Sequence, residues 1–193
     1  MTFKKYSMKI QIILALILAL LNFFVAYLNT KIIHIPLFMD MIFIYTASFF
    51  GVPCGIITGV LHTFLNTIVY QHNLFHNIFV ICCITGTVFT WLLITRHEDF
   101  SWIRVLLLVF LSTIVISFEG SLIYYFFLSG DVNYSEDATI LFLVYNLVMQ
   151  DLGLQLSAFL ARLPVNLIDK TIAVICGLFI FLGIEKLINR SKN

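Results

Sequence analysis

The stretch that decides the fold is 36–70, PLFMDMIFIYTASFFGVPCGIITGVLHTFLNTIVY, in which two apolar runs flank Gly51-Val52-Pro53. Proline lacks an amide N–H and glycine tolerates unusual backbone angles, so this tripeptide predicts a tight turn between two helices. Asp40 lies near the start of the first run, and His62 and Asn66 lie one helical turn apart in the second. A carboxylate in an apolar run costs about 2.5–3.5 kcal/mol on membrane-insertion scales, so it normally faces protein or a water-filled cavity. The stretch predicts a helical hairpin with polar groups near its open end.

The composition of the whole chain indicates a membrane protein. Of its 193 residues, 61% are hydrophobic and 11% charged, and the mean hydropathy is +1.04. These values predict an all-α, polytopic membrane helical bundle, and the length suffices for about six spans of roughly 20 residues. We expect no soluble catalytic or nucleotide-binding domain, and the formal charge of +1 gives no indication of a nucleic-acid partner.

Apolar runs separated by polar loops divide the chain into spans of one membrane domain, 1–193. We expect these spans near 10–28, 36–50, 54–70, 77–95, 102–128 and 165–187. The remaining apolar segment, 138–161, is interrupted by Gln150, Asp151 and Gln155 in its second half. Pro164 suits the first turn of a helix, where its missing N–H is not needed, so we expect the last span to begin just after it.

The basic residues predict the orientation, because cytoplasmic loops are enriched in lysine and arginine. Six spans with both termini inside leave only Lys31, Arg162 and Lys170 on the outer side. The inner side then holds Lys4, Lys5, Lys9, Arg96, Arg104, Lys186, Arg190 and Lys192. A seventh span at 138–161 would move the basic C-terminal tail outside. We therefore interpret 138–161 as an outer amphipathic or re-entrant segment of a multi-pass plasma-membrane protein.

This topology brings the polar groups inside the spans to one level, just under the outer surface. The candidate substrate-binding residues are Asp40, Asn66, Glu119, Gly120, Tyr124, Tyr125, Asn166, Asp169 and Lys170. A proton or ion path through the membrane needs ionisable groups at several depths, whereas these lie at one. A pocket open to the outside is the better interpretation.

Several of these residues also have structural interpretations. Asp40 and Lys170 could form an ion pair between helices, and Asp169 with Lys170 could extend outward to the interface. The two tyrosines could belong to an aromatic belt, and Asn66 could join two helices. His72 and His76 are spaced like metal ligands on a helix, but with no thiolate or carboxylate nearby we predict no metal site.

Two pairs of small residues predict close helix contacts. Gly55 and Gly59 are four residues apart in the third span, and Ala15 and Ala19 have the same spacing in the first. Small residues at this spacing let another helix approach closely. For the alanine pair, internal packing and docking of a partner protein are both open from spacing alone.

These motifs resemble a family of importer subunits. Asp40 before Phe-Phe-Gly-Val-Pro, followed by Gly55, Gly59 and Asn66, is similar to the second and third helices of the S components of energy-coupling factor (ECF) transporters. The stretch Arg162-Leu-Pro-Val-Asn-Leu-Ile-Asp-Lys170 looks like the opening of their last helix, and Ala15-xxx-Ala19 is similar to their alanine motif for the transmembrane coupling subunit.

The resemblance implies a bacterial or archaeal substrate-capture subunit. It would bind a vitamin or similar small nutrient at the outer face and depend on a coupling protein and two cytoplasmic ATPases. The chain itself contains no G-x-x-x-x-G-K-[ST] motif for ATP. The long apolar segment 138–161 departs from many small S components, and no motif identifies the nutrient.

Two other classes of protein share parts of this pattern. A multi-span sensor module shares the aspartate and glycine pattern of the hairpin, but it is usually fused to an output domain. An integral membrane enzyme needs a nucleophile or metal set on facing helices, and His62, His76 and Glu119 form no recognised set. We therefore predict a binding protein that is not an enzyme, with no catalytic residues and no cofactor.

Overall fold

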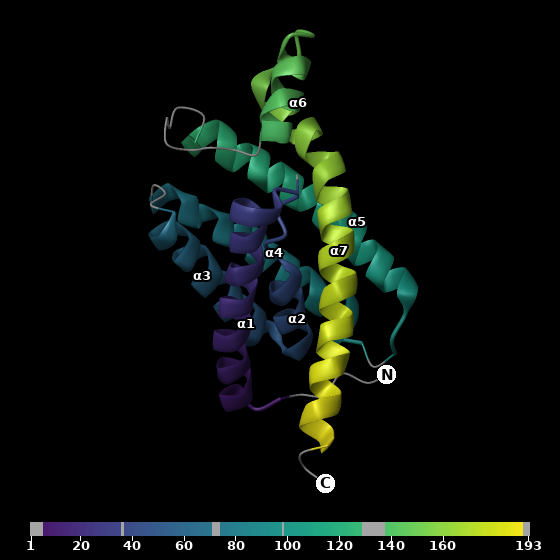
Figure 1. The fold of residues 1–193 in the computed structure, drawn as a ribbon. Helices are drawn as coiled ribbons and strands as arrows, with labels where there is room; N and C mark the ends of the chain where they lie inside the picture. Colours follow the sequence, from purple (N-terminus) through teal and green to yellow (C-terminus); the bar gives the residue numbers. More distant parts are fainter. Residues whose placement is uncertain (1–5, 36, 71–73, 98, 129–137, 191–193) are drawn as a thin grey trace.

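The computed structural model describes residues 6–35, 37–70, 74–97, 99–128 and 138–190, and all regular structure within them is helical (Figure 1). The α-helices are α1 (Met8–Leu28), α2 (Ile42–Phe50), α3 (Val52–Val69), α4 (Val80–Thr90), α5 (Trp102–Ile123), α6 (Ala138–Val148) and α7 (Leu154–Arg190). A short 3-10 helix, Leu74–Phe79, precedes α4, and wider π-helical turns extend α1, α4 and α5 over Asn29–Ile33, Trp91–Thr95 and Tyr124–Leu128. The prediction of an all-α bundle is confirmed.

Five of these helices are long and apolar enough to cross a membrane. They cover Met8–Ile33, Val52–Val69, His76–Thr95, Trp102–Phe127 and Leu154–Arg190. Their outward surfaces carry large apolar side chains, such as Leu106 and Phe179, which are 68% and 59% exposed. Such a surface suits lipid rather than water. The chain is therefore a multi-pass helical membrane protein.

The second predicted span, 36–50, differs from the prediction. Only the nine residues of α2 are helical, and a helix of that length rises about 14 Å, roughly half of a bilayer's hydrocarbon core. Residues 37–41 are not helical, with bends at Leu37 and Met41, and Met39 has a φ of +53°. The helix is short because side chains on other helices satisfy the backbone of this segment, as described below.

The predicted turn at Gly51-Val52-Pro53 is confirmed. Gly51 joins α2 to α3 with a φ of +149°, a backbone conformation that residues with a Cβ rarely adopt. Pro53 follows in the first turn of α3, where its missing N–H leaves no hydrogen bond unmade. The hairpin of α2 and α3 is thus determined locally by these two residues.

Both pairs of small residues lie at internal helix contacts. A Cβ added at Gly55 would come within 2.5 Å of Ser48 Oγ, and one at Gly59 within 2.5 Å of Cys83 Cβ, so α3 approaches α2 and α4 closely there. Ala15 and Ala19 are 0% and 1% exposed. The Ala15 carbonyl accepts a hydrogen bond from Thr58 of α3 at 3.4 Å. The internal interpretation of the alanine pair is therefore correct, and these residues offer no surface for docking a coupling subunit.

The last helix begins much earlier than expected. Pro164 lies inside α7, which runs unbroken over 37 residues from Leu154 to Arg190, about 55 Å. Proline removes one hydrogen bond from a helix interior, here the bond to the Leu160 carbonyl. Packing outweighs that loss, because Ala158, Ala161 and Val165 are buried together with Ile140 and Val144 of α6.

The segment 138–161 is accordingly a helical hairpin rather than one continuous helix. It consists of α6, a reversal at Asp151 with a φ of +62°, and the first two turns of α7. Figure 1 shows this hairpin extending beyond one end of the bundle, which we call the α6 end. Its location outside the membrane remains a prediction.

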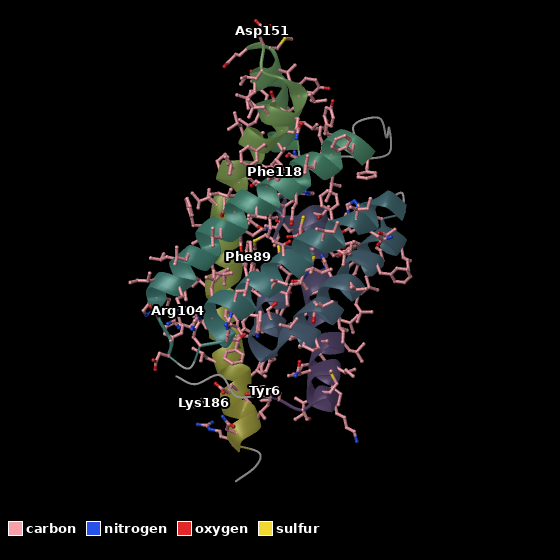
Figure 2. All side chains as sticks on the ribbon, turned by 180° about the vertical axis from the view of Figure 1, so that it is seen from behind. Tyr6, Phe89, Arg104, Phe118, Asp151 and Lys186 are labelled. Carbon is pink, nitrogen blue, oxygen red and sulfur yellow. The ribbon has the colours of Figure 1, made fainter. Side chains whose placement is uncertain are left out.

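Charged residues mark the opposite end of the bundle. In Figure 2, Arg104, Lys186 and Tyr6 lie toward the end away from Asp151, and we call this the basic end. The Tyr6 hydroxyl donates to Glu185 Oε1 at 3.3 Å, which ties the start of the chain to the end of α7. Burial, reinforced by the Glu185 carboxylate, raises the pKa of Tyr6 to about 12, so the phenol keeps its proton and remains the donor.

Candidate functional site

A cavity of about 120 Å³ lies toward the α6 end, among the segment before α2, α3, the 3-10 helix Leu74–Phe79, α4, α5 and α7. All of these except α4 contribute polar or small groups, which are Asp40 before α2, His62, Thr63 and Asn66 of α3, His76 of the 3-10 helix, Gly120 of α5, and Arg162, Asn166 and Lys170 of α7. Apolar side chains complete the wall, namely Phe38, Met41, Phe79, Cys82, Cys83 and Ile116. The cavity is therefore amphipathic, as small-molecule sites usually are.

A buried charge cluster forms one side of the cavity. Lys170 is 2% exposed, and its Nζ lies 2.7 Å from Asp169 Oδ2 and 3.9 Å from Asp40 Oδ1. Asp169, 1% exposed, also accepts a hydrogen bond from the Met39 amide at 2.8 Å. The alternative in which Asp169 and Lys170 extend outward to the interface does not apply, because both side chains are buried and a close ion pair and this amide compensate their charges inside the bundle.

Asp40 differs from Asp169 in its surroundings. Its side chain is 41% exposed, it lines the cavity, and its Oδ1 accepts no hydrogen bond among the described residues. The ion pair with Lys170 is present, but at 3.9 Å it is much longer than the Lys170–Asp169 pair. One carboxylate thus neutralises the lysine, and the other is left at the cavity wall.

Two asparagines that are not among the predicted site residues, Asn22 of α1 and Asn29 just after it, hold the segment before α2 in place. Asn22, fully buried, donates to the Asp40 carbonyl and accepts from the Phe43 amide at 2.9 Å. Asn29 donates to the Leu37 carbonyl at 2.6 Å. These side chains replace the hydrogen bonds that a helix over 37–41 would have made, as buried backbone requires. Two amides seven residues apart in an otherwise apolar span were the available signal.

An imidazole and an amide form a second polar group. His62 is 3% exposed, and its Nε2 lies 3.1 Å from Asn66 Nδ2. An amide nitrogen can only donate, so Nε2 accepts, and the neutral ring then carries its proton on Nδ1. Neither His62 Nδ1 nor Asn66 Oδ1 has a hydrogen-bond partner among the described residues. The sequence analysis noted His62 but did not include it among the site residues.

Asn166 shows the same half-satisfied pattern. It is 2% exposed, and its Nδ2 donates to Ser117 Oγ at 2.9 Å. Its Oδ1 has no partner within the described part of the chain. A buried polar atom without a hydrogen bond costs about 1–3 kcal/mol. The cavity wall therefore holds several buried polar atoms whose hydrogen bonds are unmade.

Arg162 is a cavity residue that the sequence analysis assigned only to the outer charge count. It is 3% exposed, donates to the Ala158 carbonyl at 3.0 Å, and lies over the Tyr124 ring at 5.1 Å. Because α7 is continuous through Pro164, Arg162, Asn166 and Lys170 form one row at i, i+4 and i+8. That spacing was visible in the sequence, but the expected break at Pro164 concealed it.

The other predicted site residues lie beside the cavity rather than in its wall. Glu119 accepts a hydrogen bond from Thr85 at 2.6 Å, which joins α5 to α4. Tyr124 contacts Arg162, and Tyr125 is 41% exposed. Asp40, Asn66, Gly120, Asn166 and Lys170 are brought together as predicted, and Asp169 supports them through Lys170.

No metal centre is built from the described residues, since no three His, Cys, Asp or Glu side chains lie close enough together to hold an ion. His72, one member of the predicted histidine pair, lies outside the described residues. Comparisons with known protein families, with curated proteins and with solved structures find no match. The fold and the cavity therefore identify the chain as a multi-pass helical membrane protein with an amphipathic cavity at its α6 end.

Proposed function

We propose that this protein captures a small nutrient in the cavity at the α6 end, as the substrate-binding subunit of an ECF-type importer. The observation that carries the proposal is the set of buried polar atoms without hydrogen bonds at the cavity wall, on His62, Asn66 and Asn166. Native proteins keep few such atoms, because each lowers stability. A bound solute that forms hydrogen bonds with these atoms would remove this cost.

Capture fits the distribution of polar groups better than conduction does. Toward the basic end, α2 and α7 meet through aromatic rings. The ring centroid of Phe181 lies 5.6 Å from that of Phe49 and 4.7 Å from that of Phe50. Among the described residues, this aromatic packing closes the contact between α2 and α7 below the polar site. Release of the solute to the other side of the membrane then requires a partner that moves the whole bundle or opens it.

The partners we propose are a transmembrane coupling subunit and two cytoplasmic ATPases, in a bacterial or archaeal plasma membrane. The support for them is the sequence resemblance together with the absence of an ATP motif. Because Ala15 and Ala19 are buried, the coupling subunit must contact another surface. The cavity residues act here as hydrogen-bonding groups and not as catalysts.

The proposal can be tested by filling the cavity. Gly120 lines the cavity, and a Cβ there would meet only side-chain atoms of Arg162, at 3.5 Å. The side chain of Gly120→Leu therefore occupies part of the cavity, and its Cβ clashes with no backbone atom. Gly183→Leu is the matched control, because a Cβ at Gly183 meets nothing within 4 Å. Both proteins are purified from cells grown in rich medium, and small molecules released by denaturation are identified by mass spectrometry.

We expect wild type and Gly183→Leu to release the same solute in near-stoichiometric amounts, and Gly120→Leu to release little. Equal release from both variants would place any bound solute elsewhere and overturn the proposed site. Co-purification of ATPases with the wild-type protein tests the importer assignment separately. If the purified protein contains the solute but ATPases co-purify with it under none of the growth conditions tested, a ligand-input module becomes the better assignment.

A further inference from the structure

The size of the cavity limits its ligand. An apolar cavity of about 150 Å³ in another protein holds one benzene molecule, and the volume here is about 120 Å³. Two fused rings need considerably more space. The apolar part of the wall includes two aromatic side chains, Phe38 and Phe79, together with Met41 and Ile116. Such a wall suits the faces of one planar ring.

The unmade hydrogen bonds limit the ligand further. Three oxygens of cavity-lining residues accept no hydrogen bond among the described residues: Asp40 Oδ1, Asn66 Oδ1 and Asn166 Oδ1. They belong to three different elements, the segment before α2, α3 and α7. Oxygen acceptors of this kind are satisfied by N–H or O–H groups, of water or of a ligand. A ligand that replaces water at this wall without losing hydrogen bonds therefore carries at least two donors.

The same wall also offers a donor. The contact between Asn66 Nδ2 and His62 Nε2 places the ring proton of neutral His62 on Nδ1, which has no acceptor among the described residues. A ring nitrogen or carbonyl oxygen of the ligand can accept from it. Donors and an acceptor combined on one small ring are typical of amino-substituted nitrogen heterocycles.

The charges disfavour a ligand carboxylate. Lys170 is already paired with Asp169 at 2.7 Å and has Asp40 at 3.9 Å, so two carboxylates face one ammonium group. The Arg162 guanidinium is engaged with the Ala158 carbonyl and the Tyr124 ring. The two cations that line the cavity, Lys170 and Arg162, are thus already engaged, whereas Asp40 and the two amide oxygens would repel a ligand carboxylate.

We infer that the cavity selects a single-ring nitrogen heterocycle that carries an exocyclic amino group and no carboxylate. The inference rests on the proposed function and specifies the substrate class of the same site. The ring lies between the apolar side chains, the amino group donates to the acceptor oxygens, and a ring nitrogen accepts from His62 Nδ1.

Four matched probes test this ligand class by isothermal titration calorimetry on the purified full-length protein in lipid nanodiscs. The probe 2-aminopyrimidine has the amino group and the single ring, and pyrimidine lacks the donors. Pyrimidine-2-carboxylate replaces the donors by a charge, and 2-aminoquinazoline adds a fused ring. We expect 2-aminopyrimidine to bind at least tenfold more tightly than each of the other three. Loss of one buried hydrogen bond, by about 1.4 kcal/mol or more, gives a change of that size.

Substitutions locate the bound probe. Asn166→Leu and Asn66→Leu each remove one acceptor oxygen and are expected to weaken 2-aminopyrimidine binding about ten- to hundredfold. Asn146→Leu is the control, because Asn146 is on exposed α6 and bonds only its own helix, at Phe142. Two independent variants guard against one failing to fold, and a thermal melt checks each.

The outcomes separate the ligand class from the proposed function. Equal binding of pyrimidine overturns the donor requirement, tighter binding of the carboxylate overturns the charge argument, and tighter binding of 2-aminoquinazoline overturns the size limit. In all three cases the cavity remains a solute site. Absence of binding by every probe also overturns the ligand class. The proposed site is tested separately, by the solute that Gly120→Leu and Gly183→Leu release, and the importer assignment by co-purification of ATPases.

Discussion

The two ends of the bundle are built from the same helices by opposite means. Toward the basic end, α2 and α7 pack through Phe49, Phe50 and Phe181, all buried and without polar atoms. Toward the α6 end, α7 instead presents Asn166, Asp169 and Lys170, and several polar atoms there have no hydrogen bond. An apolar core in lipid needs no such groups, and this difference between the two ends is the support for our proposal that the α6 end binds a ligand.

The largest expected difference between the ends is which side of the membrane each one faces. Asp151 and Lys186 are both exposed and lie at opposite ends. In a Cys176→Ser background, which removes the one exposed native cysteine among the four, we expect Asp151→Cys to react with a membrane-impermeant maleimide in intact cells. Lys186→Cys should react only after permeabilisation. Labelling of Lys186→Cys from outside would reverse the orientation and place the cavity on the cytoplasmic side.

The next largest effect concerns the buried charge cluster. Asp169→Ala leaves the Lys170 ammonium and the Met39 amide without their closest partner. Removing one member of a buried ion pair costs about 3–5 kcal/mol. We expect the free energy of unfolding in detergent to fall by that amount, measured by chemical denaturation.

The control for this loss is an aspartate outside the cluster. Asp151→Ala removes an exposed carboxylate at the tip of the α6–α7 hairpin, and surface substitutions usually change stability by less than about 0.5 kcal/mol. If both variants lost the same stability, Asp169 would not hold the cluster together.

A smaller loss is expected at the basic end. Phe181→Ala opens a cavity beside Phe49 and Phe50 and should lower stability by about 3 kcal/mol, at the low end for buried phenylalanine because lipid already solvates apolar groups. Phe179→Ala, two residues away and 59% exposed, should change little. Solute binding should survive in both variants. Loss of binding in Phe181→Ala alone would show that the two ends are coupled.

The sequence predicted what depends on local chemistry. Gly51 and Pro53 determine the turn between α2 and α3 through backbone geometry. The apolar runs give the approximate place of the five long helices, although they also predicted a sixth span at 36–50. Asp40, Asn66, Asn166 and Lys170 were grouped correctly because alternating helix directions bring residues of equal depth together. Depth in the membrane can be derived from position along a helix, so these parts were accessible.

The predictions from the sequence were wrong or left open where tertiary packing outweighs a local rule. Pro164 normally marks a helix start, but packing of α6 against Ala158 and Ala161 keeps α7 continuous, and this placed Arg162 at the cavity. The short α2 depends on amide groups of Asn22 and Asn29, far away in sequence. Ala15 and Ala19 could face inward or outward from spacing alone, and only the packing of α3 decides.

The central claim is that the unmade hydrogen bonds at the α6 end serve a ligand, and one double variant tests it most directly. Asn66→Leu combined with Asn166→Leu removes two amides whose oxygens have no partner, and also their bonds to His62 and Ser117. Hydrogen bonds between helices in membranes average about 0.6 kcal/mol, so the loss is offset by removing two unsatisfied groups.

The measurement is the free energy of unfolding of this double variant without solute, together with the solute released on denaturation. We predict a stability within about 1 kcal/mol of wild type and no bound solute. A variant that unfolds several kcal/mol more easily, or that retains the wild-type amount of solute, would contradict the claim and assign these asparagines to the framework of the bundle.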